Sequence, residues 1–432
     1  MTKRRAVLLV LLGVSVVILI AALVWKPAEP VPTGPATDLK VIVLAVDGLD
    51  WFLLDKYMDE GTLPTIARIF RSAVTGEIEA DRPVVPSVGW TMVARGVPLD
   101  EAETSMVESG GAARLYGVVP EVVRLVNQGG GDAVAIGWPA AWPLREDGIQ
   151  VVAPYSPDAP DHPRTLAPAL FDGAPGQATD PRLSEAVSRA VASNLETIDD
   201  EFAKKIHGGG QAGMDEALAG VQWGYLADRI TLDVAGRTIA EREFDLALVY
   251  VGGLDAAMHR FLAPAMPDYF EDLNTSGGSY SDVVPNYFRF VDDAVARLLR
   301  LADKRTIFVL MSAYGTHPSL QTPPATGGHE LGPPGVLLVR GPALAGKGTQ
   351  LSVNTFDMAP TMLAALGLPI PLEMSGHVVL EMLPQGFAQE YPPALDERSW
   401  SPSRSEDEPP ECEQMERLVT ERLSVMRAGV SD

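Results

Sequence analysis

The feature of this sequence that most constrains the fold is an alternation of short apolar segments with segments of helical spacing, which begins near Asp38. The apolar segments have the length of buried strands, and the segments between them place apolar residues on one helical face. This alternation predicts an α/β fold with a mainly parallel sheet covered by helices. We expect strands at residues 40–46, 133–137, 244–251, 306–312 and 335–340, and helices that include 121–126, 181–204 and 287–301.

Two regions interrupt the alternation and indicate the domain organisation. Residues 154–239 begin with a loop rich in Pro and Asp and continue as helices, which is typical of an insertion or cap beside the sheet. Residues 384–432 are rich in Pro and acidic residues up to a short predicted helix at 411–426, and we interpret them as a largely solvated acidic tail. The predicted α/β domain therefore spans residues 39–383.

The N-terminus has the pattern of a membrane anchor. Three basic residues, Lys3, Arg4 and Arg5, precede the uncharged segment 6–25. As a helix this segment would be about 30 Å long, which is enough to cross a bilayer. The alternative is a cleaved secretory signal, but its apolar region is usually shorter, and the residues after Trp25 do not resemble a small-residue cleavage site.

The charge flanking this segment predicts its orientation. Basic residues stay on the cytoplasmic side, so the chain that follows the anchor at residues 1–25 would lie outside the cytoplasm. In a bacterium this places a single-pass protein in the inner membrane, with the bulk of the chain in the periplasm. Residues 26–38 are rich in Pro and are predicted to form an extended spacer.

Composition excludes several other classes of protein. A chain of 432 residues that is 46% hydrophobic can bury a substantial core, which excludes a disordered protein. The net charge of -23 argues against binding to nucleic acid or to anionic lipid, because both would repel such a surface. The single cysteine, Cys412, rules out an internal disulfide and a cysteine-rich zinc module.

The candidate functional residues follow the predicted strands, because ligands gather at the carboxyl ends of strands in sheets of this kind. Asp47 follows the first strand, although taken alone this position favours a turn or capping residue. Asp255 and His259 follow the strand at 244–251, and their spacing can place a carboxylate and an imidazole, a usual zinc pair, on one side of a helical turn. His329 lies in a glycine-rich loop, where the alternative is a surface residue.

The order of these residues resembles the alkaline phosphatase superfamily, specifically its type I phosphodiesterase and nucleotide pyrophosphatase branch. The resemblance runs from about Lys40 to Val379 and implies the three-layer α/β sandwich of that superfamily. The segments that carry it, in chain order, are 41–48, 90–96, 136–143, 254–261, 328–329 and 356–363.

In this family two metal ions, typically zinc, flank a Ser or Thr nucleophile that attacks a phosphoryl group and forms a covalent intermediate. One ion stabilises the nucleophilic alkoxide and the other stabilises the leaving oxygen. The resemblance implies that Asp255, His259 and His329 hold one ion and leave a coordination position open. It implies that Asp47, the nucleophile and an Asp-His pair hold the second ion.

The sequence departs from the family at the second ion. After the strand at 306–312 the family has Ser-Asp-His-Gly, and here Ala313 and Tyr314 stand in place of the Asp and His. Alanine has no donor atom and neutral tyrosine is a poor zinc ligand, so Asp47 is the one firm ligand that is kept. His317 is an alternative ligand three residues later, although a histidine in a surface loop is the commoner outcome.

The sequence also departs from the family at the nucleophile. The slot ten residues before Gly96, where relatives have a Ser or Thr before a Pro, is occupied by Pro86, and the candidate nucleophile Ser87 follows it. A slip of one residue commonly reverses the direction of a side chain. Arg95 replaces the threonine that is usual before the glycine.

Three functions follow from this pattern. The first is a membrane-anchored, zinc-dependent phosphoesterase that acts outside the cytoplasm on a small phosphoester or a headgroup. The second is a pseudoenzyme, a binding or scaffolding module with one bound ion and a protein partner, which the changes at Pro86, Arg95, Ala313 and Tyr314 favour. The third is a headgroup transferase, which would need the same nucleophile. The region 154–239 carries no recognisable substrate signature.

Overall fold

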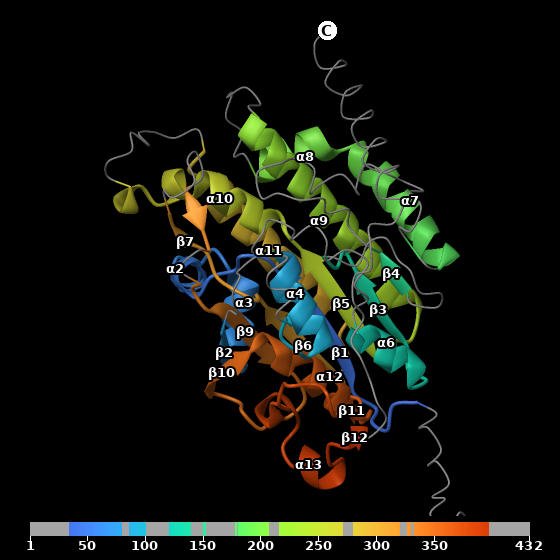
Figure 1. Cartoon of the computed structure of the whole chain (residues 1–432). Coiled ribbons are helices and arrows are strands. Elements are labelled where there is room, and N and C mark those ends of the chain that lie inside the picture. Colours follow the sequence, from blue (N-terminus) through green and yellow to red (C-terminus); the bar gives the residue numbers. More distant parts are fainter. Residues whose placement is uncertain are drawn as a thin grey trace, which may run out of the picture. The chain divides into compact units, whose positions relative to one another are not determined.

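The computed structural model describes most of the predicted α/β domain (Figure 1), namely residues 34–79, 86–100, 121–139, 150–152, 178, 180–206, 216–270, 280–319, 326–329 and 332–396. These residues belong to one compact unit, Gly34–Asp432. The predicted anchor at 1–25, most of the spacer at 26–38 and the predicted helix at 411–426 lie outside the described residues. Within the described ranges, no helix has the length and apolar character needed to cross a membrane.

An eight-stranded sheet forms the centre of the domain, with the strand order β10-β2-β9-β6-β1-β5-β3-β4. Five of its strands were predicted, namely β1 (Lys40–Val46), β3 (Ala133–Ile136), β5 (Leu246–Val251), β6 (Thr306–Met311) and β9 (Gly335–Arg340). The other three, which were not predicted, are β2 (Val74–Glu79), β4 (Gln150–Val152) and β10 (Gln350–Asn354). Strand β9 runs antiparallel to both of its neighbours, β2 and β6, and the other pairs are parallel. The predicted mainly parallel sheet is confirmed.

Helices cover both faces of the sheet. Along β1 alternate side chains point to opposite faces, so that Leu44 belongs to one core and Val43 to the other. The core that contains Leu44 includes residues of α2 (Trp51–Asp59), α3 (Pro64–Phe70), α9 (Glu216–Glu241), α10 (Gly253–Ala265) and α11 (Val283–Leu299). The core that contains Val43 includes residues of α4 (Pro86–Arg95), α6 (Glu121–Gln128) and α12 (Met358–Ala365). This arrangement is a three-layer α/β sandwich.

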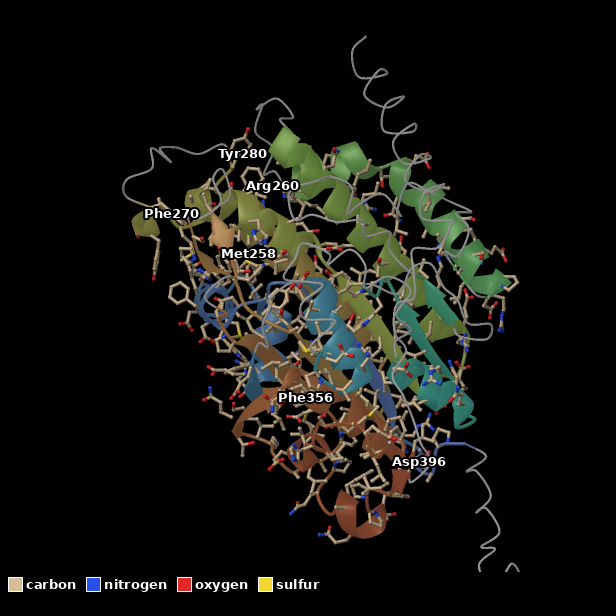
Figure 2. All side chains as sticks on the ribbon, viewed as in Figure 1. Met258, Arg260, Phe270, Tyr280, Phe356 and Asp396 are labelled. Atoms are coloured by element: carbon tan, nitrogen blue, oxygen red, sulfur yellow. The ribbon has the colours of Figure 1, made fainter. Side chains whose placement is uncertain are left out.

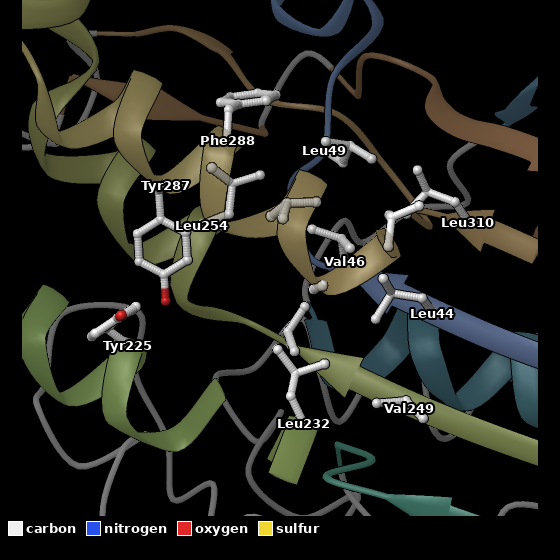
Figure 3. Packing of buried hydrophobic residues seen from close by; sticks show 14 of the residues in the cluster. Leu44, Val46, Leu49, Tyr225, Leu232, Val249, Leu254, Tyr287, Phe288 and Leu310 are labelled. Atoms are coloured by element: carbon white, nitrogen blue, oxygen red, sulfur yellow. The ribbon is translucent and has the colours of Figure 1, made fainter. Parts of the chain in front are cut away.

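The first of these cores fixes α10 on the sheet. Leu254 of α10 lies near Tyr287 and Phe288 of α11 and near Val46 at the end of β1 (Figure 3). All four side chains are fully buried. Because each large apolar side chain contributes about 1.5–3 kcal/mol on burial, this packing holds the start of α10 close to the carboxyl end of β1.

The region predicted as an insertion, 154–239, differs from the prediction at its end. It forms α7 (Pro181–Leu195), α8 (Ile198–Lys205) and α9, and α9 is a layer of the sandwich rather than a cap, because it contacts β5 and β3 directly. It also contacts α7, α10 and α11. A helix that is covered by so many neighbours has no one-sided apolar pattern, which is why the sequence did not place it against the sheet.

The start of the predicted tail, residues 384–396, also belongs to the domain. Phe387 of α13 (Phe387–Glu390) is buried in the second core. Strand β12 (Leu395–Asp396), whose last residue is labelled in Figure 2, pairs with β11 (Ile370–Pro371). The Pro and acidic content predicted a solvated segment, but the burial of Phe387 and the pairing of β12 with β11 attach its start to the domain. The rest of the predicted tail, residues 397–432, lies outside the described residues.

Candidate metal centre

Two of the predicted ligands lie on helix α10, which begins directly after β5. Asp255 is in the first turn and His259 is four residues later, so both side chains lie on the same side of the helix. Met258 and Arg260, which flank His259 in the sequence, mark this part of α10 in Figure 2. The helix thus presents a carboxylate and an imidazole at the carboxyl end of the parallel strands.

The third predicted ligand comes from a separate segment. His329 follows β8 (Gly327–Gly328), which contacts α10. Its Nε2 lies 3.1 Å from Nε2 of His259 and 2.8 Å from Oδ1 of Asp255, and Oδ2 of Asp255 lies 3.4 Å from Nε2 of His259. In the part of the chain that the structure describes, these three form the one group of such side chains whose ligand atoms all lie within 4.8 Å of one another. The structure brings the three predicted ligands together.

Backbone carbonyls orient both imidazoles. Nδ1 of His259 lies 2.8 Å from the carbonyl oxygen of Gly327, and Nδ1 of His329 lies 2.7 Å from that of Gly315. A carbonyl can only accept a hydrogen bond, so each Nδ1 donates and each Nε2 is directed into the cluster as a potential metal ligand. A hydrogen bond from the ring nitrogen that does not bind the metal is the usual way in which proteins fix metal-binding histidines. One carboxylate and two imidazoles with converging lone pairs fit a divalent transition-metal ion with an open coordination position.

Gly48 makes room for this cluster. It follows Asp47 and has φ of 69°, a left-handed conformation that favours glycine. A Cβ atom at Gly48 would lie 2.6 Å from Oδ1 of Asp255 and 2.8 Å from Oγ1 of Thr316. The Asp-Gly pair after β1 is therefore a spatial requirement of the cluster.

The three side chains perturb one another electrostatically. Burial raises the pKa of the Asp255 carboxyl, but the adjacent His259 and His329 outweigh burial and hold it well below its ordinary value. Burial lowers the pKa of His259, but the Asp255 carboxylate outweighs burial and raises it to about 9. The same carboxylate raises the pKa of His329. In the metal-free protein the cluster therefore holds a proton that a metal ion must displace.

Because a metal ion must displace a proton from the cluster, a rise in pH should have opposite effects on the stability of the metal-free protein and on its affinity for metal. The pKa of His259 in the folded protein, about 9, lies above its unfolded value near 6.5. Its imidazolium therefore stabilises the metal-free fold fully below about pH 6.5, and that stability is lost as the pH rises toward 9. Metal affinity should instead rise across this window, by about tenfold per pH unit for one displaced proton. Urea unfolding and metal titrations at matched pH test this, and an affinity that does not change with pH would contradict it.

Asp47, the candidate ligand of a second ion, is already bound by protein donors. Its Oδ1 accepts a hydrogen bond of 3.0 Å from Nε1 of Trp90, and its Oδ2 accepts one of 2.7 Å from the hydroxyl of Tyr250. Trp90 is held in turn by edge-to-face contacts with Trp138 and Tyr250, at centroid distances of 5.6 and 5.5 Å. The carboxyl is 2% exposed, and its two oxygens both have partners within the protein.

Tyr314 lies between Asp47 and the three-residue cluster. Its ring contacts the ring of His329 at a centroid distance of 4.6 Å. Burial and the Asp255 carboxylate raise the pKa of Asp47 to about 6, and Tyr314, Tyr250 and Trp90 act in the opposite direction. Although the Tyr314 hydroxyl is close enough to lower this pKa, it forms no hydrogen bond of good geometry with a described residue.

The sequence identifies the family. Residues 98–323, just over half of the chain, match the type I phosphodiesterase / nucleotide pyrophosphatase family. The chain belongs to this family. Asp255 and His259 lie within the matched residues, and Asp47, Ser87 and His329 lie outside them. No curated protein sequence matches the chain.

Solved structures show the fold. An alkaline phosphatase PafA mutant is 11% identical, with a TM-score of 0.50 over 82% of this chain and 100% of that one. A putative sulfatase from Bacteroides thetaiotaomicron is 12% identical (TM-score 0.47, 84% and 76% covered), and murine ectonucleotide pyrophosphatase / phosphodiesterase 5 with AMP is 12% identical (TM-score 0.42, 77% and 96% covered). At such identities the PafA match supports the alkaline-phosphatase-like fold alone.

The family pattern for the second ion is incomplete among the described residues. Ala313 is fully buried, and it stands where the family pattern has aspartate. A Cβ atom at Gly89 of α4 would lie 3.1 Å from Cβ of Ala313 and 3.3 Å from Cε1 of Tyr314. Helix α4 therefore lies directly against the segment that replaces the Asp-His pair. The second ion position therefore keeps Asp47 and lacks the Asp-His pair of the family pattern.

The other predicted site residues have different outcomes. The backbone places Ser87 in the first turn of α4, and its side chain lies outside the described part of the structure. Arg95, in the last turn of the same helix, is buried. His317 lies on β7 (His317–Pro318), opposite Gly328, and it is not one of the three clustered residues.

Trp90 and Tyr250 are the functional residues that sequence analysis missed. Aromatic residues in an apolar strand or helix are usually core residues, and neither was considered as a donor to Asp47. The signal lies in the strand register: Tyr250 pairs with Ala45, two residues before Asp47, so Tyr250 and Asp47 are near neighbours at the end of the sheet.

Proposed function

We propose that this protein is a one-metal, non-hydrolytic member of its family, in which Asp255, His259 and His329 hold a zinc ion and the domain acts as a binding or scaffolding module. The observation that carries this proposal is the state of Asp47. Its Oδ1 accepts a hydrogen bond from Trp90 and its Oδ2 accepts one from Tyr250, so both oxygens already have donors that compete with a second ion for this carboxylate.

The chemistry that a second ion supplies in this family supports the proposed absence of hydrolysis. An ion at the three-residue cluster would supply a Lewis acid with an open position for an anionic oxygen. In-line displacement of a phosphoester also needs a nucleophile activated near neutral pH. Ala313 and Tyr314 provide no ligand for an ion that would lower the pKa of a serine hydroxyl, so a bound phosphoester would be held without being cleaved.

We propose the remaining features from the sequence. Residues 1–25 would anchor the protein in a bacterial inner membrane, with the described domain in the periplasm. The ligand would be a small phosphoester, a headgroup or a protein that presents an anionic group to the ion. The net charge of -23 makes nucleic acid an unfavourable partner.

A second candidate function is phosphodiester hydrolysis with one ion. The observation that favours it is the position of Ser87 in the first turn of α4, the helix that contacts Tyr314 through Gly89 and Asp47 through Trp90. The start of a helix favours anions, so a serine there would lie in a suitable field for phosphate.

One pair of measurements separates the two functions. Metal analysis of the purified protein should give about one ion per chain, and two ions would contradict the one-metal proposal. Hydrolysis of bis(4-nitrophenyl) phosphate by the wild type should equal that of Ser87→Ala and of Asp255→Ala. A wild-type rate more than about tenfold above Ser87→Ala would establish the second candidate instead.

A further inference from the structure

A buried carboxylate of α9 holds the start of the helix that carries two of the metal ligands. Asp228 is 4% exposed. Its Oδ1 accepts a hydrogen bond of 3.0 Å from the backbone N–H of Gly252, and its Oδ2 accepts one of 3.0 Å from that of Gly253. Oδ2 also accepts a hydrogen bond of 2.8 Å from the hydroxyl of Tyr287 on α11. One side chain therefore links α9, α10 and α11.

Helix α10 depends on this contact because it cannot cap itself. Its N-cap residue is Gly252, and no side chain caps the first backbone N–H groups from within the helix. Such groups need acceptors, usually the side chain of the N-cap residue. Asp228 supplies both acceptors from another helix.

The backbone of α10 at Gly253 is closely surrounded by side chains of the neighbouring helices. A Cβ atom at Gly253 would lie 1.7 Å from the Tyr287 hydroxyl and 2.8 Å from Oδ2 of Asp228, so the two side chains touch the backbone of α10 itself. Farther along, α10 is kinked at Phe261, where φ is -123° and ψ is 18°. The regular part that carries the ligands is therefore short and is defined mainly at its first turn.

The ligands must be aligned with a residue from another segment. Asp255 lies two residues after Gly253, and His259 lies one turn farther, whereas His329 comes from the loop after β8. A rotation or shift at the first turn of α10 would move both helix-borne ligands relative to His329. Figure 3 shows Leu254 of this turn beside Tyr287.

We infer that Asp228 is a positioning residue of the metal centre, which holds Asp255 and His259 in alignment with His329 by fixing the first turn of α10. The inference rests on the proposed one-metal site. It makes α9, a helix with no metal ligand of its own, a determinant of metal affinity.

The chain contains a matched control. Asp292 on α11 is also 4% exposed and also binds two successive backbone N–H groups at the start of a helix. It accepts hydrogen bonds of 3.1 Å from Thr65 and 2.7 Å from Ile66 of α3. Helix α3 carries none of the three clustered residues, so this carboxylate also binds the start of a helix but has no link to the metal centre.

The experiment compares Asp228→Asn with Asp292→Asn in the full chain. Each amide substitution replaces one acceptor oxygen by a donor, so both variants should lose thermal stability in the metal-free state. Competition with a chromophoric chelator gives the zinc affinity, and the visible spectrum of the Co²⁺-loaded protein reports ligand geometry. We expect Asp228→Asn to weaken zinc binding by about 10–100-fold with an altered Co²⁺ spectrum, and Asp292→Asn to change affinity by less than about threefold.

An unchanged affinity in Asp228→Asn, or an equal loss in both variants, would overturn the inference. Failure of the wild type to bind zinc would instead overturn the proposed one-metal site. If Asp228→Asn does not fold, Tyr287→Phe removes one hydrogen bond and leaves the carboxylate with both amides. It should weaken zinc binding by about threefold, and an unchanged affinity there would also count against the inference.

Discussion

Replacing His329 by alanine should weaken zinc binding by more than about 100-fold, because loss of a direct ligand exceeds the 10–100-fold effect of removing an outer contact. Nε2 of His329 is 3.1 Å from Nε2 of His259 and 2.8 Å from Oδ1 of Asp255. Without it the remaining ligands are two side chains of one helix. The ion content after dialysis should fall from about one per chain to none.

The matched control for this variant is His377→Ala. The side chain of His377 is 89% exposed, and the residue is not part of the cluster, so its removal should leave zinc binding unchanged. Zinc at 100 times its dissociation constant should stabilise the wild type and His377→Ala by about 2.7 kcal/mol, and His329→Ala by much less. Retention of wild-type affinity in His329→Ala would show that the ion binds elsewhere.

Restoring the family residues with Ala313→Asp and Tyr314→His should not restore a second ion. The double variant should bind about one zinc per chain and lose about 3 kcal/mol or more of stability, the usual cost of an uncompensated buried charge. Position 313 is fully buried, and helix α4 lies against it at Gly89. The new carboxylate would also add charge near Asp47, whose pKa is already raised to about 6 by burial and Asp255.

A neutral variant separates charge from size. Ala313→Asn with Tyr314→His has nearly the same volume, so the difference in unfolding free energy between the two double variants measures the charge. The unfolding free energy of both double variants is then measured at increasing zinc concentrations. A second bound ion that recovers the lost stability would show that Asp47 releases Trp90 and Tyr250, and that the scaffold still accepts two ions.

The sheet shows how far the sequence determines the fold. Short, largely apolar segments identified β1, β5, β6 and β9, because both faces of these strands are covered by helices. An apolar pattern does not indicate whether a strand runs parallel or antiparallel to its neighbours, so the antiparallel orientation of β9 was not predicted. Strand β2 alternates between buried and exposed residues over a short length, and its sequence resembles that of a loop.

Part of the candidate metal centre could likewise be predicted from the sequence, and part could not. Asp255, His259 and His329 were predicted as one ligand set because the order of the sequence motifs resembles the family, and the spacing of the first two residues on α10 is local. The hydrogen bonds of Trp90 and Tyr250 to Asp47 were not, because they depend on packing between α4 and the strands. A sequence shows the loss of two ligands, but it does not show what occupies the space they leave.

The carbonyl oxygen of Gly315, which accepts the Nδ1 hydrogen bond of His329, belongs to the same short segment as Ala313 and Tyr314. That segment is fixed by main-chain contacts, with the N–H of Gly315 bonded to the carbonyl of Pro333. The backbone of this segment therefore helps to orient His329, beside the contact of its ring with that of Tyr314. A segment that supplies none of the three clustered residues thus supports the candidate metal centre through its main chain.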